Sequence, residues 1–239
     1  MLRYFIIRST SIEELETFNT RRHIRAGYFL VNLPCMSKKQ QVLIIHGGTT
    51  FKTHEDYIHF LESYDLALEK LTPKKDWKDS LQAELGEGFE VFQPRMPNGS
   101  NAQYQEWKLW FNKILSLLDD NVILVGHSLG GIFLAKYLSE EFSSKKVKAI
   151  FLIAAPFDDT GITESLGSFT LVKSFDMFKK QTEKIFLYFS KDDAVAPFVH
   201  AKKYLENLPE ATLRIFEDRG HFKQANFPEL VQDIKNLTD

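Results

Sequence analysis

The segment of residues 121–131, NVILVGHSLGG, constrains the fold of this chain more than any other. A short apolar run of strand length, residues 122–125, leads through Gly-His-Ser-Leu-Gly into a helix-compatible stretch, residues 132–138. A serine between glycines, with a strand before it and a helix after it, is typical of a sharp turn that raises the hydroxyl above a sheet. The flanking glycines keep Cβ atoms away from the crowded turn. The pattern therefore predicts that Ser128 is a nucleophile.

Further apolar runs of strand length alternate along the chain with longer helical patterns. The predicted strands are 42–46, 89–93, 122–125, 147–153, 185–190 and 212–216. The predicted helices are 54–71, 77–85, 101–118, 132–142, 197–208 and 227–237. The strands are apolar on both faces, which indicates a mostly parallel sheet covered by helices on either side. The predicted fold class is therefore α/β, with a doubly wound sheet.

The length of 239 residues and the hydrophobic content of 44% fit a single domain over residues 1–239. Residues 1–41 are interpreted as an N-terminal extension, in which 3–7 and 28–33 are candidate edge strands and 12–20 a candidate helix. The long connection 157–182 has weak periodicity and is expected to form a short cap-like loop near the site. It is too short for a large lid domain.

The charge balance narrows the range of partners. With 30 basic and 32 acidic residues the net charge is -2, which gives no reason to expect nucleic acid or an anionic membrane as a partner.

A single cysteine, Cys35, excludes an intrachain disulfide and fits a reducing compartment. The apolar start of the chain is too short for a signal-peptide core, and no apolar run approaches the ~20 residues of a membrane span. We expect a cytoplasmic protein, and no feature indicates a protein partner.

A nucleophilic serine needs a base, and the base needs a carboxylate that orients it. Two later strand ends supply both groups, since Asp193 follows the run 185–190 and His221 follows the run 212–216. Asp192 competes for the acid role, but it is also suited to cap the turn through its own side chain. We favour Asp193, because it begins the D-x-V-x-P type of acid turn. Ser128, Asp193 and His221 are therefore the predicted catalytic residues.

The other histidines have plainer interpretations. His127 is next to Ser128, but neighbours on a turn point in different directions, so it is expected to support the strand end. His46 precedes two glycines and is expected to brace their loop by hydrogen bonds. No group of His, Cys, Asp and Glu has metal-ligand spacing, so neither a metal nor another cofactor is expected.

Backbone amides are expected to stabilise the oxyanion of the transition state. The amide of Leu129, the residue after the nucleophile, is one predicted donor. The loop 46–50, HGGTT, follows the first central strand, and its glycines let amides face a substrate oxygen. Gly48 is the first choice for the second donor and Thr49 the second choice, while a plain strand-to-helix turn is the alternative interpretation.

With these residues identified, the chain resembles the α/β-hydrolase superfamily from residue 42 to the C-terminus. The chain order serine, aspartate, histidine is the order of that fold. Within it, Gly126-His127-Ser128, the pair Asp192-Asp193 and Gly220-His221-Phe222 are most similar to the small lidless serine hydrolases of the retinoblastoma-binding and YdeN-like group. In that group the second aspartate of the pair matches the acid. The N-terminal extension and an insertion after Phe51 depart from the compact members.

These residues predict a serine hydrolase of the carboxylesterase type, which cleaves small carboxylic esters or thioesters through an acyl-enzyme. Acyl transfer or peptide cleavage on the same residues is a second interpretation, and a non-catalytic binding protein on a hydrolase fold is a third. The sequence does not identify the acyl group or the oligomeric state. Phenylalanines near the predicted site loops suggest an apolar pocket, although most of them fit a core equally well: Phe51, Phe133, Phe157, Phe169, Phe198 and Phe222.

Overall fold

A computed structural model describes residues 38–72, 74–171, 174–182 and 184–237. The predicted strands and helix within residues 1–37 lie outside the described residues. Residues 40 and 41, assigned above to the extension, already belong to the first strand.

Six parallel strands form one sheet in the order β2-β1-β3-β4-β5-β6. The strands are β1 (Gln40–Ile45), β2 (Phe89–Phe92), β3 (Val122–His127), β4 (Val147–Ile153), β5 (Ile185–Ser190) and β6 (Thr212–Phe216). The predicted parallel, doubly wound sheet is confirmed. Strand β6 is more exposed than its apolar sequence indicates, because it forms an edge of the sheet.

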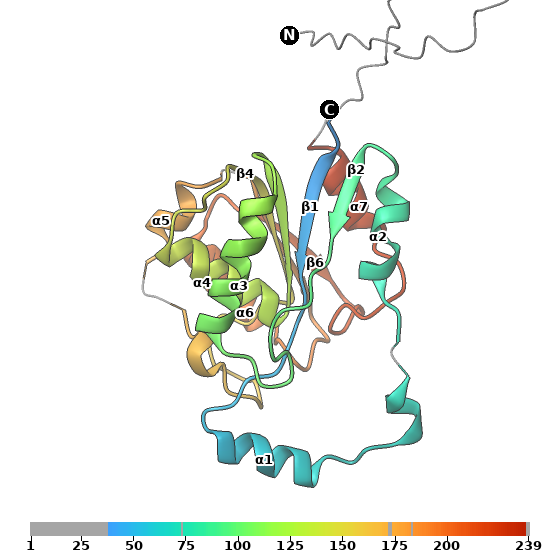
Figure 1. Cartoon of the computed structure of the whole chain (residues 1–239), viewed down its shortest axis with the longest axis vertical. Coiled ribbons are helices and arrows are strands. Elements are labelled where there is room, and N and C mark those ends of the chain that lie inside the picture. The colour runs from blue at the N-terminus through green and yellow to red at the C-terminus, as the bar shows by residue number, and fades with distance from the viewer. Residues whose placement is uncertain (1–37, 73, 172–173, 183, 238–239) are drawn as a thin grey trace, which may run out of the picture. The chain divides into compact units, whose positions relative to one another are not determined.

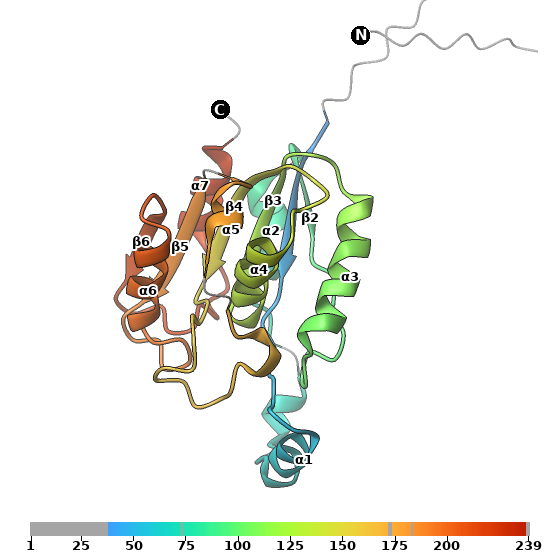
Figure 2. The ribbon, with the colours of Figure 1, turned by 90° about the vertical axis from the view of Figure 1, so that its left-hand side faces the viewer.

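Helices cover both faces of this sheet. The helices of the described residues are α1 (His54–Ser63), α2 (Trp77–Leu85), α3 (Tyr104–Leu117), α4 (Leu129–Glu140), α5 (Asp176–Lys179), α6 (Val199–Asn207) and α7 (Pro228–Lys235), with two 3₁₀ turns, η1 (Leu68–Leu71) and η2 (Gly167–Phe169). Figures 1 and 2 show α3, α4 and α6 on one face and α2 and α7 on the other. No large lid domain is present among the described residues.

Alternate residues of the central strands enter two separate cores. Leu43 and Leu124 point into the core beneath α3, α4 and α6, whereas Ile44 and Ile123 point into the core beneath α2 and α7. This alternation follows from the period of two in a strand, and it explains why the central strands are apolar throughout.

The helix predicted over residues 54–71 is shorter than expected. Thr53 begins it with a capping box, in which the Thr53 hydroxyl accepts from the amide of Asp56 and the Asp56 carboxylate accepts from the amide of Thr53. The helix ends at Ser63, and none of its residues is buried. An apolar period stabilises a helix mainly by packing its face against a core, and that packing is missing here.

The strand order reverses between β1 and β3. The chain passes from β1 to β2, which pairs with one edge of β1, and then to β3, which pairs with the other edge of β1. Ligands of open parallel sheets bind at the carboxyl ends of the strands where the order reverses in this way. The loop after β1 and the turn after β3 meet at this point, and they carry Gly48 and Ser128.

Candidate active site

Ser128 lies on the sharp turn between β3 and α4. Its φ of 55° and ψ of -123° are unusual for a serine. The turn is held by the amide of Ser128, which donates to the carbonyl of Ile153 at 2.9 Å, and by the amide of Gly131, which donates to the Ser128 carbonyl at 2.9 Å. The hydroxyl is thereby directed toward the carboxyl ends of the strands.

Two glycines around Ser128 are required by close backbone contacts. A Cβ atom on Gly126 would lie 2.6 Å from the Gly130 carbonyl oxygen, and a Cβ atom on Gly130 would lie 2.2 Å from the carbonyl oxygen of Ile45. Side chains at either position would separate the start of α4 from β1 and β3. The two flanking glycines of the sequence motif therefore have a steric reason in this fold.

The structure brings the three predicted side chains into one hydrogen-bonded row. The distance from His221 Nε2 to Ser128 Oγ is 2.9 Å, and the distance from His221 Nδ1 to Asp193 Oδ2 is 2.9 Å. Because a carboxylate only accepts, Nδ1 carries the proton and Nε2 is free to accept from the serine hydroxyl. Asp193 also accepts from the amides of Val195 and Ala196 through Oδ1, at 2.8 and 2.9 Å.

The neighbouring aspartate has a different set of partners. Asp192 Oδ1 accepts from the hydroxyl of Ser190 at 2.5 Å and from the amide of Gly220 at 2.8 Å. The Ser190 hydroxyl, and after it the Gly220 amide, lower the pKa of Asp192. Of the two aspartates, the carboxylate of Asp193 is thus the one hydrogen-bonded to the imidazole of His221.

Candidate oxyanion donors lie beside Ser128. Leu129 is the first residue of α4, so its amide has no acceptor within the helix and lies at the positive end of the helix dipole. A Cβ atom on Gly48 would be 3.3 Å from the Leu129 side chain, which places Gly48 against the same turn. The amide of Thr49 donates to the Gly99 carbonyl at 2.9 Å and is therefore engaged. This contact favours Gly48 over Thr49 as a donor.

Two other histidines near the site form hydrogen bonds with backbone groups. His46 Nε2 accepts from the amide of Met96 at 2.8 Å, and its Nδ1 lies 2.5 Å from the Gly47 carbonyl oxygen. His127 Nε2 lies 2.9 Å from the carbonyl oxygen of His221. Burial, and to a lesser degree the charges of Lys78 and His221, lower the pKa of His127 well below its ordinary value. His127 is therefore a neutral donor to the loop that carries His221.

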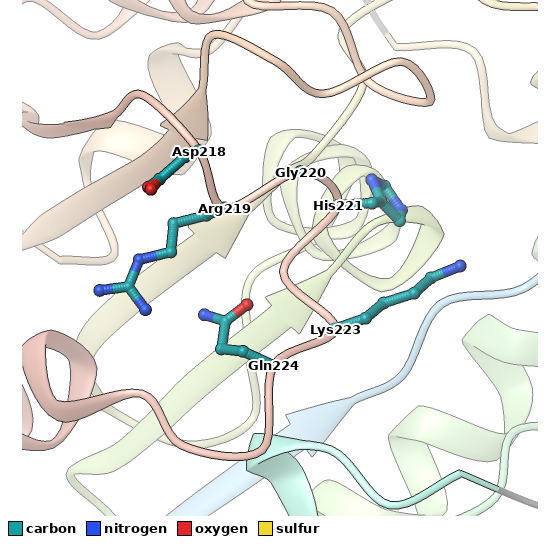
Figure 3. Close-up of a pocket in the computed structure, with 6 residues that line it drawn as sticks. All are labelled: Asp218, Arg219, Gly220, His221, Lys223 and Gln224. Atoms are coloured by element: carbon teal, nitrogen blue, oxygen red, sulfur yellow. The ribbon is translucent and has the colours of Figure 1, made fainter.

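Figure 3 shows the loop around His221, where a surface hollow is lined by Asp218, Arg219, Gly220, His221, Lys223 and Gln224. Ser128 and Leu129 are not among the residues that line it, whereas His221 is. Burial raises the pKa of Glu164, while the charges of His221 and Lys223 act in the opposite direction. Glu164 therefore lies within electrostatic range of His221.

The phenylalanines expected near the site divide between the cores and the surface loops. Phe133, Phe169 and Phe222 are fully buried in the two cores, which fits the plainer of the two interpretations above. Phe51 is half-buried and packs on Tyr57 of α1 at a ring distance of 5.4 Å.

Among the described residues, no group of three or more His, Cys, Asp or Glu side chains is arranged to hold a metal ion.

One contributor to this site had no signal in the sequence. Trp77, at the start of α2, donates from Nε1 to the carbonyl of Phe222 at 2.9 Å and from its backbone amide to the carbonyl of Gln224 at 2.8 Å. It is separated from Phe222 by 145 positions, so no local spacing connects the two residues. Only the assembled fold brings α2 against the His221 loop.

Comparison with known proteins identifies the family of this chain. Residues 70–236 match the family model described as serine hydrolase, and this range includes Ser128, Asp193 and His221. The chain belongs to the serine hydrolase family. The match begins after β1, so the loop that carries Gly48 lies outside it.

Individual relatives support the assignment of this chain to the serine hydrolase family. It is 28% identical to serine hydrolase RBBP9 of Rattus norvegicus over 152 residues, which are 63% of this chain and 78% of that protein. It is 25% identical to the Bacillus subtilis protein YdeN over 190 residues, which are 77% of this chain and 86% of that protein. The predicted resemblance to this group and to the α/β-hydrolase fold is confirmed.

The crystal structure of the ydeN gene product from B. subtilis is similar to this fold. The TM-score is 0.66 with 22% sequence identity, and the match covers 84% of this chain and 99% of that chain. In the part of this serine hydrolase that the structure describes, no helix combines the length and the apolar character that crossing a membrane requires.

Proposed function

We propose that this serine hydrolase cleaves small carboxylic esters or thioesters through a covalent acyl-enzyme. The observation that carries the proposal is the unbroken row from Ser128 Oγ through the imidazole of His221 to Asp193, with both links at 2.9 Å. A serine, a base and an orienting carboxylate in hydrogen-bond contact form the arrangement that activates a hydroxyl for attack on a carbonyl carbon.

In the first half of the reaction, Ser128 Oγ attacks the substrate carbonyl carbon and His221 Nε2 accepts the hydroxyl proton. Asp193 keeps the Nδ1 proton in place and stabilises the imidazolium. The amides of Leu129 and Gly48 donate to the oxygen that becomes negative in the tetrahedral intermediate. When the intermediate collapses, His221 gives the proton to the leaving oxygen or sulfur, and the acyl group remains on Ser128.

In the second half, water attacks the acyl-enzyme. His221 Nε2 removes a proton from the water, and the same two amides stabilise the second tetrahedral intermediate. The proton then returns to Ser128 Oγ, and the carboxylic acid leaves. Every proton is carried by His221, so the cycle restores the starting enzyme.

Labelling by a fluorophosphonate probe tests the nucleophile. We expect the wild-type protein to be labelled and Ser128→Ala to remain unlabelled, with kcat for p-nitrophenyl butyrate reduced by about 10⁴-fold or more and the thermal transition retained. Ser139→Ala in α4 is a matched control, because the hydroxyl of this buried serine donates to the Ala135 carbonyl within the same helix. Equal labelling of wild type and Ser128→Ala would exclude the proposed nucleophile.

A panel of esters and thioesters of increasing acyl length, together with matched amides, tests the substrate class. We expect turnover of short esters and thioesters to exceed that of the amides. Faster cleavage of amides, or faster transfer to added alcohols than to water, would replace ester hydrolysis by peptide cleavage or acyl transfer on the same residues.

A further inference from the structure

The loop that carries His221 contains an unfavourable backbone conformation. Gly220 and Phe222, the residues on either side of His221, both have a φ of 50°. A positive φ is favourable for glycine but is an outlier for a bulky residue such as phenylalanine. Such a backbone persists only where surrounding groups determine it. The position of the imidazole therefore depends on contacts from outside the loop.

Four consecutive residues of this loop each have a backbone group bonded to a side chain from elsewhere in the fold. The amide of Arg219 donates to Ser190 Oγ at 2.9 Å, and the amide of Gly220 donates to Asp192 Oδ1 at 2.8 Å. The carbonyl of His221 lies 2.9 Å from His127 Nε2, and the carbonyl of Phe222 accepts from Trp77 Nε1 at 2.9 Å. We call Ser190, Asp192, His127 and Trp77 the support residues.

The support residues come from separate elements that surround the site. Ser190 ends β5, Asp192 lies in the loop after it, His127 ends β3, and Trp77 begins α2. None of them hydrogen-bonds to the imidazole, whose two nitrogens are bonded to Ser128 and Asp193. In Figure 3 the His221 ring extends to the opposite side of the loop from the Arg219 side chain.

The protonation of these groups follows from their partners. A backbone carbonyl only accepts, so His127 must carry its proton on Nε2, and its lowered pKa keeps it in this neutral form. The hydroxyl of Ser190 accepts from the Arg219 amide and donates to Asp192 Oδ1, so Ser190 and Asp192 act as one connected unit. The four hydrogen bonds of the support residues thus fix the backbone of residues 219–222.

We infer that the support residues, and Asp192 above all, are positioning residues that set the distance between His221 Nε2 and Ser128 Oγ. This inference rests on the proposed function, because that distance matters to a rate only where His221 moves the serine proton. A misplacement of about 1 Å in such a site reduces turnover on the order of 10²-fold. The first aspartate of the pair thereby has a separate role from Asp193.

Asp192 allows a sharp test, because its side chain is exposed and both of its bonds use the single oxygen Oδ1. Asp192→Ala removes both bonds, whereas Asp192→Asn keeps an acceptor oxygen and loses only the charge. With p-nitrophenyl butyrate, we expect Asp192→Ala to lower kcat by about 10- to 100-fold with KM within about twofold of wild type. We expect Asp192→Asn to recover kcat to within about threefold of wild type.

Trp77→Phe provides a second variant, because it removes the indole N–H but keeps an aromatic ring in the core. We expect a fall in kcat without a matching change in KM, as for Asp192→Ala. Trp110→Phe is its control, since Trp110 is 44% exposed on α3 and belongs to neither the site nor the support residues.

Amide hydrogen exchange separates this inference from the proposed function, since it needs no substrate. Exchange over residues 218–224 is expected to be faster in Asp192→Ala than in wild type and unchanged in Asp192→Asn. Unchanged exchange or unchanged kcat in Asp192→Ala would overturn the positioning role, and so would an Asn variant as impaired as the Ala variant. A wild type that ignores the fluorophosphonate probe would refute the proposed function instead, while the exchange result would still decide whether Asp192 holds the loop.

Discussion

At the scale of single residues, backbone strain gathers at the carboxyl ends of the strands. Among the described residues, five non-glycine residues have a positive φ, and two of them are asparagines, which tolerate it. The other three are Ser128 directly after β3, Ala154 directly after β4 and Phe222 in the loop after β6. Each costs roughly 1–3 kcal/mol relative to an ordinary conformation, so the surrounding hydrogen bonds and packing must hold it. The strain at Ser128 directs its hydroxyl, and the strain at Phe222 accompanies the placement of His221.

The two adjacent aspartates lead to a prediction at this scale. Asp193→Asn keeps the size of the side chain but disturbs the proton arrangement on His221 Nδ1, so we expect kcat to fall by about 10³- to 10⁴-fold. Steady-state kinetics with p-nitrophenyl butyrate measures the loss. Asp218→Asn, an exposed change in the His221 loop, is the control that should remain near wild type. A similar loss in both variants would mean that Asp193 has no special role.

At the scale of elements, two helices with similar sequence patterns have different environments. Helix α1 buries none of its residues, although Leu61 and Tyr64 follow the apolar spacing that predicted a helix over residues 54–71. Helix α2 buries Trp77, Leu81 and Leu85 against the sheet. The capping box of α1 starts the helix, but an apolar period adds stability only where a core accepts it.

Leucine-to-alanine variants in the two helices test this contrast. Leu81 of α2 is 1% exposed, so Leu81→Ala leaves a cavity and is expected to lower the free energy of unfolding by about 2–5 kcal/mol. Leu61 of α1 is 48% exposed, and Leu61→Ala is expected to change it by no more than about 0.5 kcal/mol. Urea unfolding measures both values. Equal losses would mean that the Leu61 side chain is buried in solution.

At the scale of the whole molecule, two buried histidines, His127 and His200, have a lowered pKa in the folded state. Burial lowers the pKa of both His127 and His200, and for His127 the charges of Lys78 and His221 lower it further. In the unfolded chain both titrate near pH 6.5. Below that pH the unfolded state binds protons that the folded state does not, so acid favours unfolding.

This difference predicts the pH dependence of stability. Above about pH 6.5 these histidines are neutral in both states and contribute no dependence, and as the pH falls below this value the free energy of unfolding should decrease. Each histidine that binds a proton in the unfolded state but not in the folded state changes the free energy of unfolding by up to about 1.4 kcal/mol per pH unit. Urea unfolding at several values between pH 7 and pH 5 measures it. His127→Gln should give a smaller slope, and an identical slope in the variant would contradict the assignment.

Sequence alone determined the parts of this protein that depend on near neighbours. The apolar runs predicted the six strands within a few residues, because a strand that is buried on both faces is apolar along its whole length. The glycines at 126 and 130 predicted the turn at Ser128, because only a residue without Cβ fits that close approach. The order of serine, aspartate and histidine along the chain then identified three side chains that the fold brings into contact.

Tertiary structure decided what depends on partners far apart in the chain. Ser128 and His221 are separated by 93 positions and Trp77 and Phe222 by 145, so no spacing rule connects them. Three features follow from the surroundings of each group: the engagement of the Thr49 amide by Gly99, the separate hydrogen-bond partners of Asp192 and Asp193, and the end of α1 at Ser63. Backbone sterics and apolar periodicity are local properties, whereas hydrogen-bond partners and burial exist only once the chain has folded.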